Sequence, residues 1–143
     1  MTLKSLLEKI ADLAIKEKCV NSSAAGTSLY QINPKKVESY PLLFSSPTGE
    51  HLVTDNYTTY TITLYYFDRL TEDSINDIDI YSASIEELKN LILKIGSLEG
   101  VFKVNDGYRI TNFADSESFD DRLAGSYCTI EIVTVNNFIC AVD

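Results

Sequence analysis

The sequence predicts an α+β fold, in which a mostly antiparallel twisted sheet of four to five strands carries two helices on one face. Two segments repeat apolar residues at helical spacing, several others alternate with a period of two, and neighbouring strands have hairpin-type links. The chain has 143 residues, of which 45% are hydrophobic and 23% charged, as is typical of one folded domain with a buried core. We expect the element order α-β-β-β-α-β-β in a single domain over residues 1–143.

The first expected element is an amphipathic helix within residues 1–20. Thr2 is placed to cap its first turn. The expected buried stripe consists of Leu3, Leu6, Leu7, Ile10, Leu13 and Ala14. Residues 21–39 are small, polar or proline-containing, which predicts an irregular loop. The sheet and the second helix then fall within residues 40–140.

A hairpin and a long strand open the expected sheet. The segments "YPLLFSS", "PTGE" and "HLVT" indicate a strand, a turn and a short return strand. The segment "YTTYTITLYYF" at 57–67 is almost entirely β-branched or aromatic, as strands prefer. Its core-facing row is expected to be Thr58, Tyr60, Ile62, Leu64 and Tyr66. The opposite row is Tyr57, Thr59, Thr61, Thr63, Tyr65 and Phe67, whose aromatic members either meet another protein or lie under a second layer such as the N-terminal loop.

The second half supplies the other helix and the remaining strands. "DIDIY" at 77–81 predicts a short strand with Ile78 and Ile80 facing inward. Ser84 and Glu87 form a capping-box pattern, so we expect the helix to begin at Ser84 and to end at Gly96 or Gly100. Its expected buried stripe is Ile85, Leu88, Leu91, Ile92 and Ile95. Two strands, "VFKVNDGYRITNF" and "SYCTIEIVTV", follow, with the polar loop "ADSESFDDRLAG" between them.

Charge is distributed unevenly along the chain. The net charge is −9, and the first 60 residues balance six lysines against six acidic residues, so the whole excess lies in residues 61–143. Because an acidic surface repels phosphate, we expect no sequence-specific binding of nucleic acid. The charged N-terminus does not resemble a signal peptide, and no segment is apolar enough to span a bilayer, so we expect synthesis in the cytoplasm and no membrane contact.

The chemically reactive residue types do not form a recognisable catalytic or metal pattern. Cys19, Cys128 and Cys140 are widely spaced and are expected to be small buried side chains rather than disulfides. His51 has no nucleophile motif near it. The acidic run "DSINDIDIYSASIEE" lacks the glycine of a calcium loop, and the acidic loop at 115–121 is open to calcium only as a minor alternative. We therefore predict no enzyme activity, no cofactor and no metal site.

Three groups of residues resemble small tail-terminator or head–tail connector proteins of tailed bacteriophages, in particular versions from phages of gut Bacteroides-type hosts. They are Phe67, Asp68, Arg69 and Leu70; Ile85, Leu88, Lys89, Asn90, Leu91 and Ile92; and Phe119, Ala124, Gly125, Tyr127, Ile130 and Ile132. The resemblance covers roughly residues 40–140 and the opening helix. It implies a virion structural protein that forms a ring at the head–tail junction, with portal or neck and tail-tube proteins as partners and DNA only as passing cargo. The alternative is a small phage-encoded adaptor or inhibitor that binds a host protein.

A ring needs contacts between two different patches of each copy. The neutral first half and the acidic second half supply unlike surfaces, and Arg69 and Arg122 are candidate partners for carboxylates of a neighbour. The residues expected at subunit or partner contacts are Tyr57, Tyr65, Phe67, Asp68, Arg69, Glu72, Asp73, Asp115, Asp120, Asp121 and Arg122.

Overall fold

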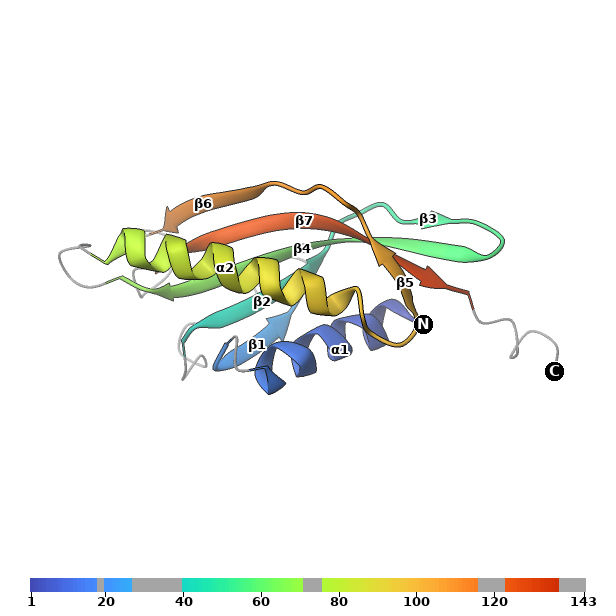
Figure 1. Cartoon of the computed structure of the whole chain (residues 1–143), viewed down its shortest axis with the longest axis horizontal. Coiled ribbons are helices and arrows are strands. Elements are labelled where there is room, and N and C mark those ends of the chain that lie inside the picture. Colours follow the sequence, from blue (N-terminus) through green and yellow to red (C-terminus); the bar gives the residue numbers. More distant parts are fainter. Residues whose placement is uncertain (18–19, 27–39, 71–75, 116–122, 137–143) are drawn as a thin grey trace.

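The computed structural model describes residues 1–17, 20–26, 40–70, 76–115 and 123–136. In this part of the chain, two helices and seven strands follow one another in the order α-β-β-β-β-α-β-β-β (Figure 1). The helices are α1 (Leu3–Lys16) and α2 (Asp77–Ile95). The strands are β1 (Ser22–Ala25), β2 (Leu42–Pro47), β3 (Leu52–Val53), β4 (Tyr57–Arg69), β5 (Val101–Val104), β6 (Ile110–Asp115) and β7 (Leu123–Val135).

Strands β4 and β7 form the centre of the sheet. They run antiparallel over 13 residue pairs, from Tyr57 beside Val135 to Arg69 beside Leu123. The outer edge of β4 pairs with both β2 and β3, and the outer edge of β7 pairs with both β5 and β6. Strand β1 adds to β2 in parallel, whereas every other described pair is antiparallel.

Both helices cover the same face of the sheet, as the sequence predicts (Figure 1). The Thr2 hydroxyl accepts a hydrogen bond from the Ser5 backbone N–H at 3.1 Å and caps α1. Helix α1 buries Leu6, Ile10 and Ala14 against the sheet. The strand residues in this helix-covered core are Leu43, Ile62, Leu64, Tyr66, Cys128, Ile130 and Ile132. The predicted inward row of the long strand is thus confirmed for Ile62, Leu64 and Tyr66.

The predicted strand at 77–81 is wrong, because these residues are the first turns of α2. Asp77 and Asp79 lie in the first turn, where a negative charge is favourable to the helix dipole. The helical backbone turns Ile78 and Ile80 to different sides, so Ile80 is buried while Ile78 is 74% exposed. Ser84 is consequently not an N-cap, and the capping-box prediction is also wrong. It lies inside α2, where its buried hydroxyl meets that of Ser126 on β7 at 2.6 Å.

The predicted stripe of α2 is confirmed for four residues. Leu88, Leu91, Ile92 and Ile95 are buried, whereas Ile85 is only partly buried. The helix ends at Gly96, which is one of the two ends predicted from the sequence.

The predicted count of four to five strands is too low, and their order differs. Strand β1 lies inside the segment 21–39 that we expected to be an irregular loop. The short return strand β3 pairs with β4 rather than with β2. The expected strand "VFKVNDGYRITNF" is two strands, because Asn105 forms a turn in which its side-chain amide donates to the Gly107 carbonyl at 2.6 Å. Strands β6 and β7 also extend into the expected loop at 114–125.

Within the described residues, neither α1 nor α2 has the combination of length and apolarity that a membrane-crossing helix requires.

Candidate functional site: the helix-free face of the sheet

Neither described helix covers the second face of the sheet. This face contains the outward row of β4 and its cross-strand partners on β7. In register order these pairs are Tyr57 with Val135, Thr59 with Val133, Thr61 with Glu131, Thr63 with Thr129, Tyr65 with Tyr127, and Phe67 with Gly125. Glu131 is the charged member of this set, so hydroxyl, aromatic and aliphatic groups form most of the face. Such a surface is better suited to contact with protein than to acid–base chemistry.

One half of this face has a small core of its own. Phe67 lies opposite Gly125 on β7, where a Cβ atom would meet backbone atoms of Tyr66 and Phe67. The Phe67 ring lies edge-on to Phe113 at 5.1 Å and stacks with Tyr65 at 6.0 Å between ring centroids. Leu42, Phe44 and Leu123 complete the buried part of this cluster.

The cluster corrects one of the aromatic predictions. Phe67 is completely buried, so its ring is not available to a partner as we expected. Tyr65 is only partly buried, and it contacts Phe44, Phe113 and Tyr127 through its ring. Burial raises the pKa of Tyr65, and the neighbouring Tyr127 adds to this effect. Tyr65 is therefore mainly a structural residue, and only the exposed part of its ring is available to a partner protein.

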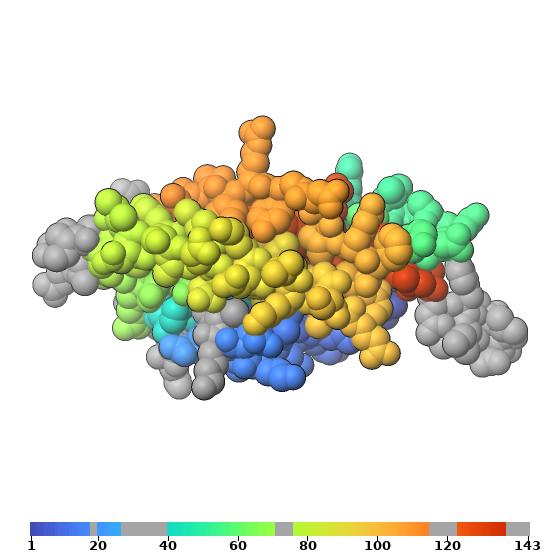
Figure 2. Space-filling model, viewed as in Figure 1, coloured from blue at the N-terminus to red at the C-terminus, as the bar shows by residue number. Residues whose placement is uncertain are grey.

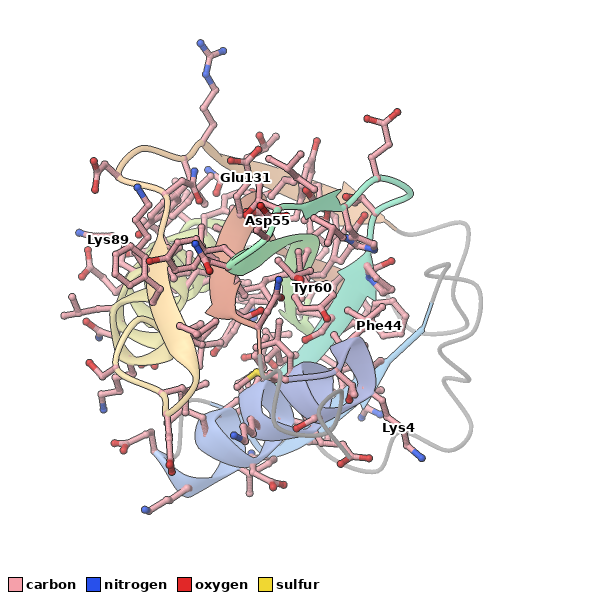
Figure 3. The ribbon with its side chains drawn as sticks, turned by 90° about the vertical axis from the view of Figure 1, so that its right-hand side faces the viewer. Lys4, Phe44, Asp55, Tyr60, Lys89 and Glu131 are labelled. Carbon is pink, nitrogen blue, oxygen red and sulfur yellow. The ribbon has the colours of Figure 1, made fainter. Side chains whose placement is uncertain are left out.

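Tyr57 lies at the opposite end of β4 and is exposed. Its ring centroid is 5.0 Å from that of Phe102 on β5, and Val135 is its partner on β7. We call Leu52, Tyr57, Phe102 and Val135 the end patch. Their side chains are 63%, 36%, 56% and 47% exposed, in that order. Figure 3 views the molecule from the end at which β3, β5 and the last residues of β7 meet.

The other end of the central strand pair carries charged residues. The Asp68 carboxylate accepts from the Arg69 backbone N–H at 2.8 Å, and the Arg69 guanidinium lies 4.8 Å from the centre of the Tyr40 ring. Arg69 and Asp115 are both register partners of Leu123, one on each side of β7. The structure thus brings the predicted contact residues Asp68, Arg69 and Asp115 to the same end of the β4–β7 pair. Glu72, Asp73, Asp120, Asp121 and Arg122 lie outside the described residues.

Two surface features were not predicted from the sequence. Leu93 on α2 is 75% exposed, and Phe102 lies across from it on the wall of an open groove of about 640 Å³. Leu93 was detectable, because it falls outside the helical stripe that ends at Ile95. Phe102 was not, because an alternating strand pattern does not show which of its two faces is covered.

Cys128 and His51 lie in different surroundings, the first buried and the second exposed. Within the described ranges, no group of three or more His, Cys, Asp and Glu side chains could hold a metal ion. Burial raises the pKa of the Cys128 thiol to about 12, so the thiol stays protonated at neutral pH. His51 is exposed, and its Nδ1 accepts from the Thr61 backbone N–H at 3.3 Å. Cys19 and Cys140 lie outside the described residues.

No protein-family model matches the chain, and no curated protein matches it either.

Proposed function

We propose that the chain is a non-enzymatic structural protein of a tailed bacteriophage, which forms a ring at the head–tail junction as a tail terminator or connector. The observation that carries the proposal is the difference between the two ends of the β4–β7 pair. One end carries the apolar end patch, and the other carries Asp68 and Arg69 on β4, with the backbone of Asp115 in register with Leu123. Since a strand of 13 residues extends on the order of 40 Å, these surfaces are far apart.

Unlike surfaces at opposite ends of a subunit suit a ring. A head-to-tail contact joins one surface of a copy to a different surface of the next, and repetition of the same rotation closes the chain of copies. A symmetric dimer would require only one self-complementary surface. The acidic excess of residues 61–143 would also let a DNA duplex pass through such a ring without being held.

The motifs behind the phage resemblance support the proposal through the fold. Phe67 ends the buried part of β4, Leu88 and Leu91 hold α2 on the sheet, and Ala124 and Ile130 face the core from β7. These residues are structural, as a protein that works through its surfaces requires. In this role the partners would be other copies, portal or neck proteins and tail-tube proteins, and the site of action would be the virion.

Light scattering across a concentration series tests the proposal. A ring protein gives a discrete mass that is a multiple of the 16.0 kDa chain, either alone or after addition of tail-tube or portal protein. The alternative, an adaptor or inhibitor that binds a host protein, predicts a monomer or dimer at every concentration that ignores those virion proteins. That second result would reject the ring.

A further inference from the structure

The last residue that the structure describes after β7 is fixed beside the end patch. The Asn136 backbone N–H donates to the Asn56 carbonyl at 2.9 Å, and its side-chain amide donates to the Thr54 carbonyl at 2.9 Å. The Thr58 hydroxyl donates to Oδ1 of the same side chain. Asn136 is therefore held at the turn between β3 and β4, and the residues that follow it in the sequence start beside the end patch.

The end patch is an apolar surface on the helix-free side of the sheet. Leu52 is the register partner of Thr59, so it shares the face of the outward row of β4. Val135 is the register partner of Tyr57, and the Phe102 ring centroid lies 5.0 Å from that of Tyr57. Figure 2 shows the green β3–β4 turn, the orange β5 and the red end of β7 gathered at one end of the molecule. The patch therefore extends across four neighbouring strands, β3, β4, β7 and β5.

The sequence after β7 has the composition of a segment that covers an apolar surface. Five consecutive apolar residues follow one another: Phe138, Ile139, Cys140, Ala141 and Val142. Such a run is unfavourable in water, because removal of apolar side chains from solvent lowers the free energy. Asn136 and Asn137 precede it, and asparagine is favoured in turns. The sequence therefore allows the chain to reverse direction after β7 and to return over the sheet.

The segment is also long enough to cover the patch. An extended chain advances about 3.3 Å per residue, so residues 137–142 span up to roughly 20 Å. Neighbouring strands are about 4.8 Å apart, so the patch measures roughly 14 Å from β3 to β5. Because the segment is tethered at Asn136, its effective concentration is far higher at its own patch than at the patch of another copy. The patch of the same chain is therefore the favoured site.

We infer that residues 138–142 pack onto the end patch of the same chain as an apolar cover. The contact is a property of the single chain and does not depend on the ring. In a free copy the segment shields the end patch, so a protein partner reaches this end of the β4–β7 pair only after displacing it. The contact also supplies the burial that the sequence predicts for Cys140.

Cys140 makes the contact measurable as a disulfide. The full-length chain carries Cys19→Ser, and Cys128 is buried with a pKa raised to about 12, so Cys140 is the reactive native thiol. Leu52→Cys adds a second thiol on the patch. Oxidised glutathione accepts the two electrons and two protons of this thiol pair and is reduced to two glutathione molecules. The rate of disulfide formation within one chain then reports how often the segment lies at position 52.

Val53→Cys is the matched control. Leu52 is 63% exposed and Val53 is 70% exposed, and as neighbours in β3 they point to opposite faces of the sheet. The tether from Asn136 is almost equally long for both positions, so a difference in rate reports the face on which the segment lies. Both positions are exposed, so neither variant should unfold the chain, and circular dichroism checks this.

We expect Leu52→Cys to form the disulfide with Cys140 at least about tenfold faster than Val53→Cys. Phe138→Asp and Phe102→Asp, each added to Leu52→Cys, should slow the reaction about tenfold, because each removes one half of the apolar contact. Mass spectrometry of the digested product identifies the linked peptides, and a non-reducing gel separates links within one chain from links between two chains.

Three results would overturn the inference. Equal rates for Leu52→Cys and Val53→Cys, or no disulfide in either variant, would show that the segment does not rest on the patch. A product linked mainly between two chains at low protein concentration would place the segment on another copy. A rate that Phe138→Asp and Phe102→Asp leave unchanged would show that the tether alone brings the thiols together. The ring stands or falls separately, by light scattering of the unmodified chain.

Discussion

The hydroxyl oxygens of Ser84 and Ser126 lie 2.6 Å apart and join α2 to β7 inside the helix-covered core. Both side chains are fully buried, and Ser126 also lies 2.7 Å from Oδ1 of Asn112 on β6. This polar group in an apolar core therefore fixes the helix relative to two strands.

Removal of either hydroxyl should break the hydrogen bond between α2 and β7, while Ser126 can still donate to Asn112 and Ser84 to the Tyr81 carbonyl. We expect Ser84→Ala and Ser126→Ala each to lower the free energy of unfolding by about 0.5–1.5 kcal/mol. The double variant should cost less than the sum, because the two residues share one hydrogen bond. Urea unfolding measures these values, and Ser82→Ala, at an exposed position of the same helix, is the control. Strictly additive losses would show that the serines act independently.

Gly125 should not tolerate a side chain. A Cβ atom at this position would overlap the Tyr66 carbonyl oxygen and lie 2.7 Å from its carbonyl carbon, and backbone atoms of a central strand cannot move away. We expect Gly125→Ala to destabilise the chain by about 3 kcal/mol or more, or to prevent folding. Gly107→Ala, where a Cβ would meet no atom within 4 Å, is the matched control. Equal thermal stabilities of the two variants would contradict the β4–β7 register.

Phe67 and Tyr57 should differ sharply although both belong to the same row of β4. Phe67 is fully buried, so Phe67→Ala should lower the free energy of unfolding by about 3–5 kcal/mol. Tyr57 is exposed at the end patch, and we expect Tyr57→Ala to cost less than about 1 kcal/mol. Chemical denaturation of the two variants measures both losses in the free energy of unfolding. A large loss at Tyr57 together with a small loss at Phe67 would mean that the aromatic cluster is misplaced.

Cys128 should make the chain less stable at alkaline pH. Its thiol has an ordinary pKa of 9.0 when unfolded and about 12 in the folded chain, because burial disfavours the thiolate. Between these values the folded state keeps a proton that the unfolded state has lost. The free energy of unfolding should therefore fall by up to about 1.4 kcal/mol for each pH unit from 9 to 12.

The control for this prediction is Cys128→Ala, which should remove the Cys128 part of the alkaline slope and leave the part due to tyrosines. Tyr65 and Tyr108 also have pKa values raised by burial and act in the same direction. Identical slopes for the wild-type chain and Cys128→Ala between pH 9 and 12 would show that the thiol ionises as easily in the folded chain as in the unfolded one.

Long periodic segments could be predicted from the sequence, and short ones could not. Residues 57–67 of the long strand are almost entirely β-branched or aromatic, so the inward-facing Ile62, Leu64 and Tyr66 were predicted correctly. "DIDIY" has only five residues. Over that length, apolar residues at alternate positions do not distinguish a strand from the first turn of a helix. The strand β1 consists of "SSAA", which has no strand preference and is ordered by pairing with β2.

The candidate site was less predictable because exposure is a tertiary property. The row of Tyr57, Tyr65 and Phe67 is continuous in sequence, yet the strand neighbours determine which of these rings is covered. Phe67 packs its ring against Phe113 and is the register partner of Gly125, and both lie far from it along the chain. Ile78 was assigned to the core because the local pattern suggested a strand, whereas the residue lies in the first turn of α2.

Negative-stain electron microscopy of the purified chain is the most direct test of assembly through unlike surfaces. The account predicts closed rings of uniform diameter with a central opening, formed alone or on added tail tubes. Single compact particles at every concentration, with no decoration of tail tubes or portals, would contradict it.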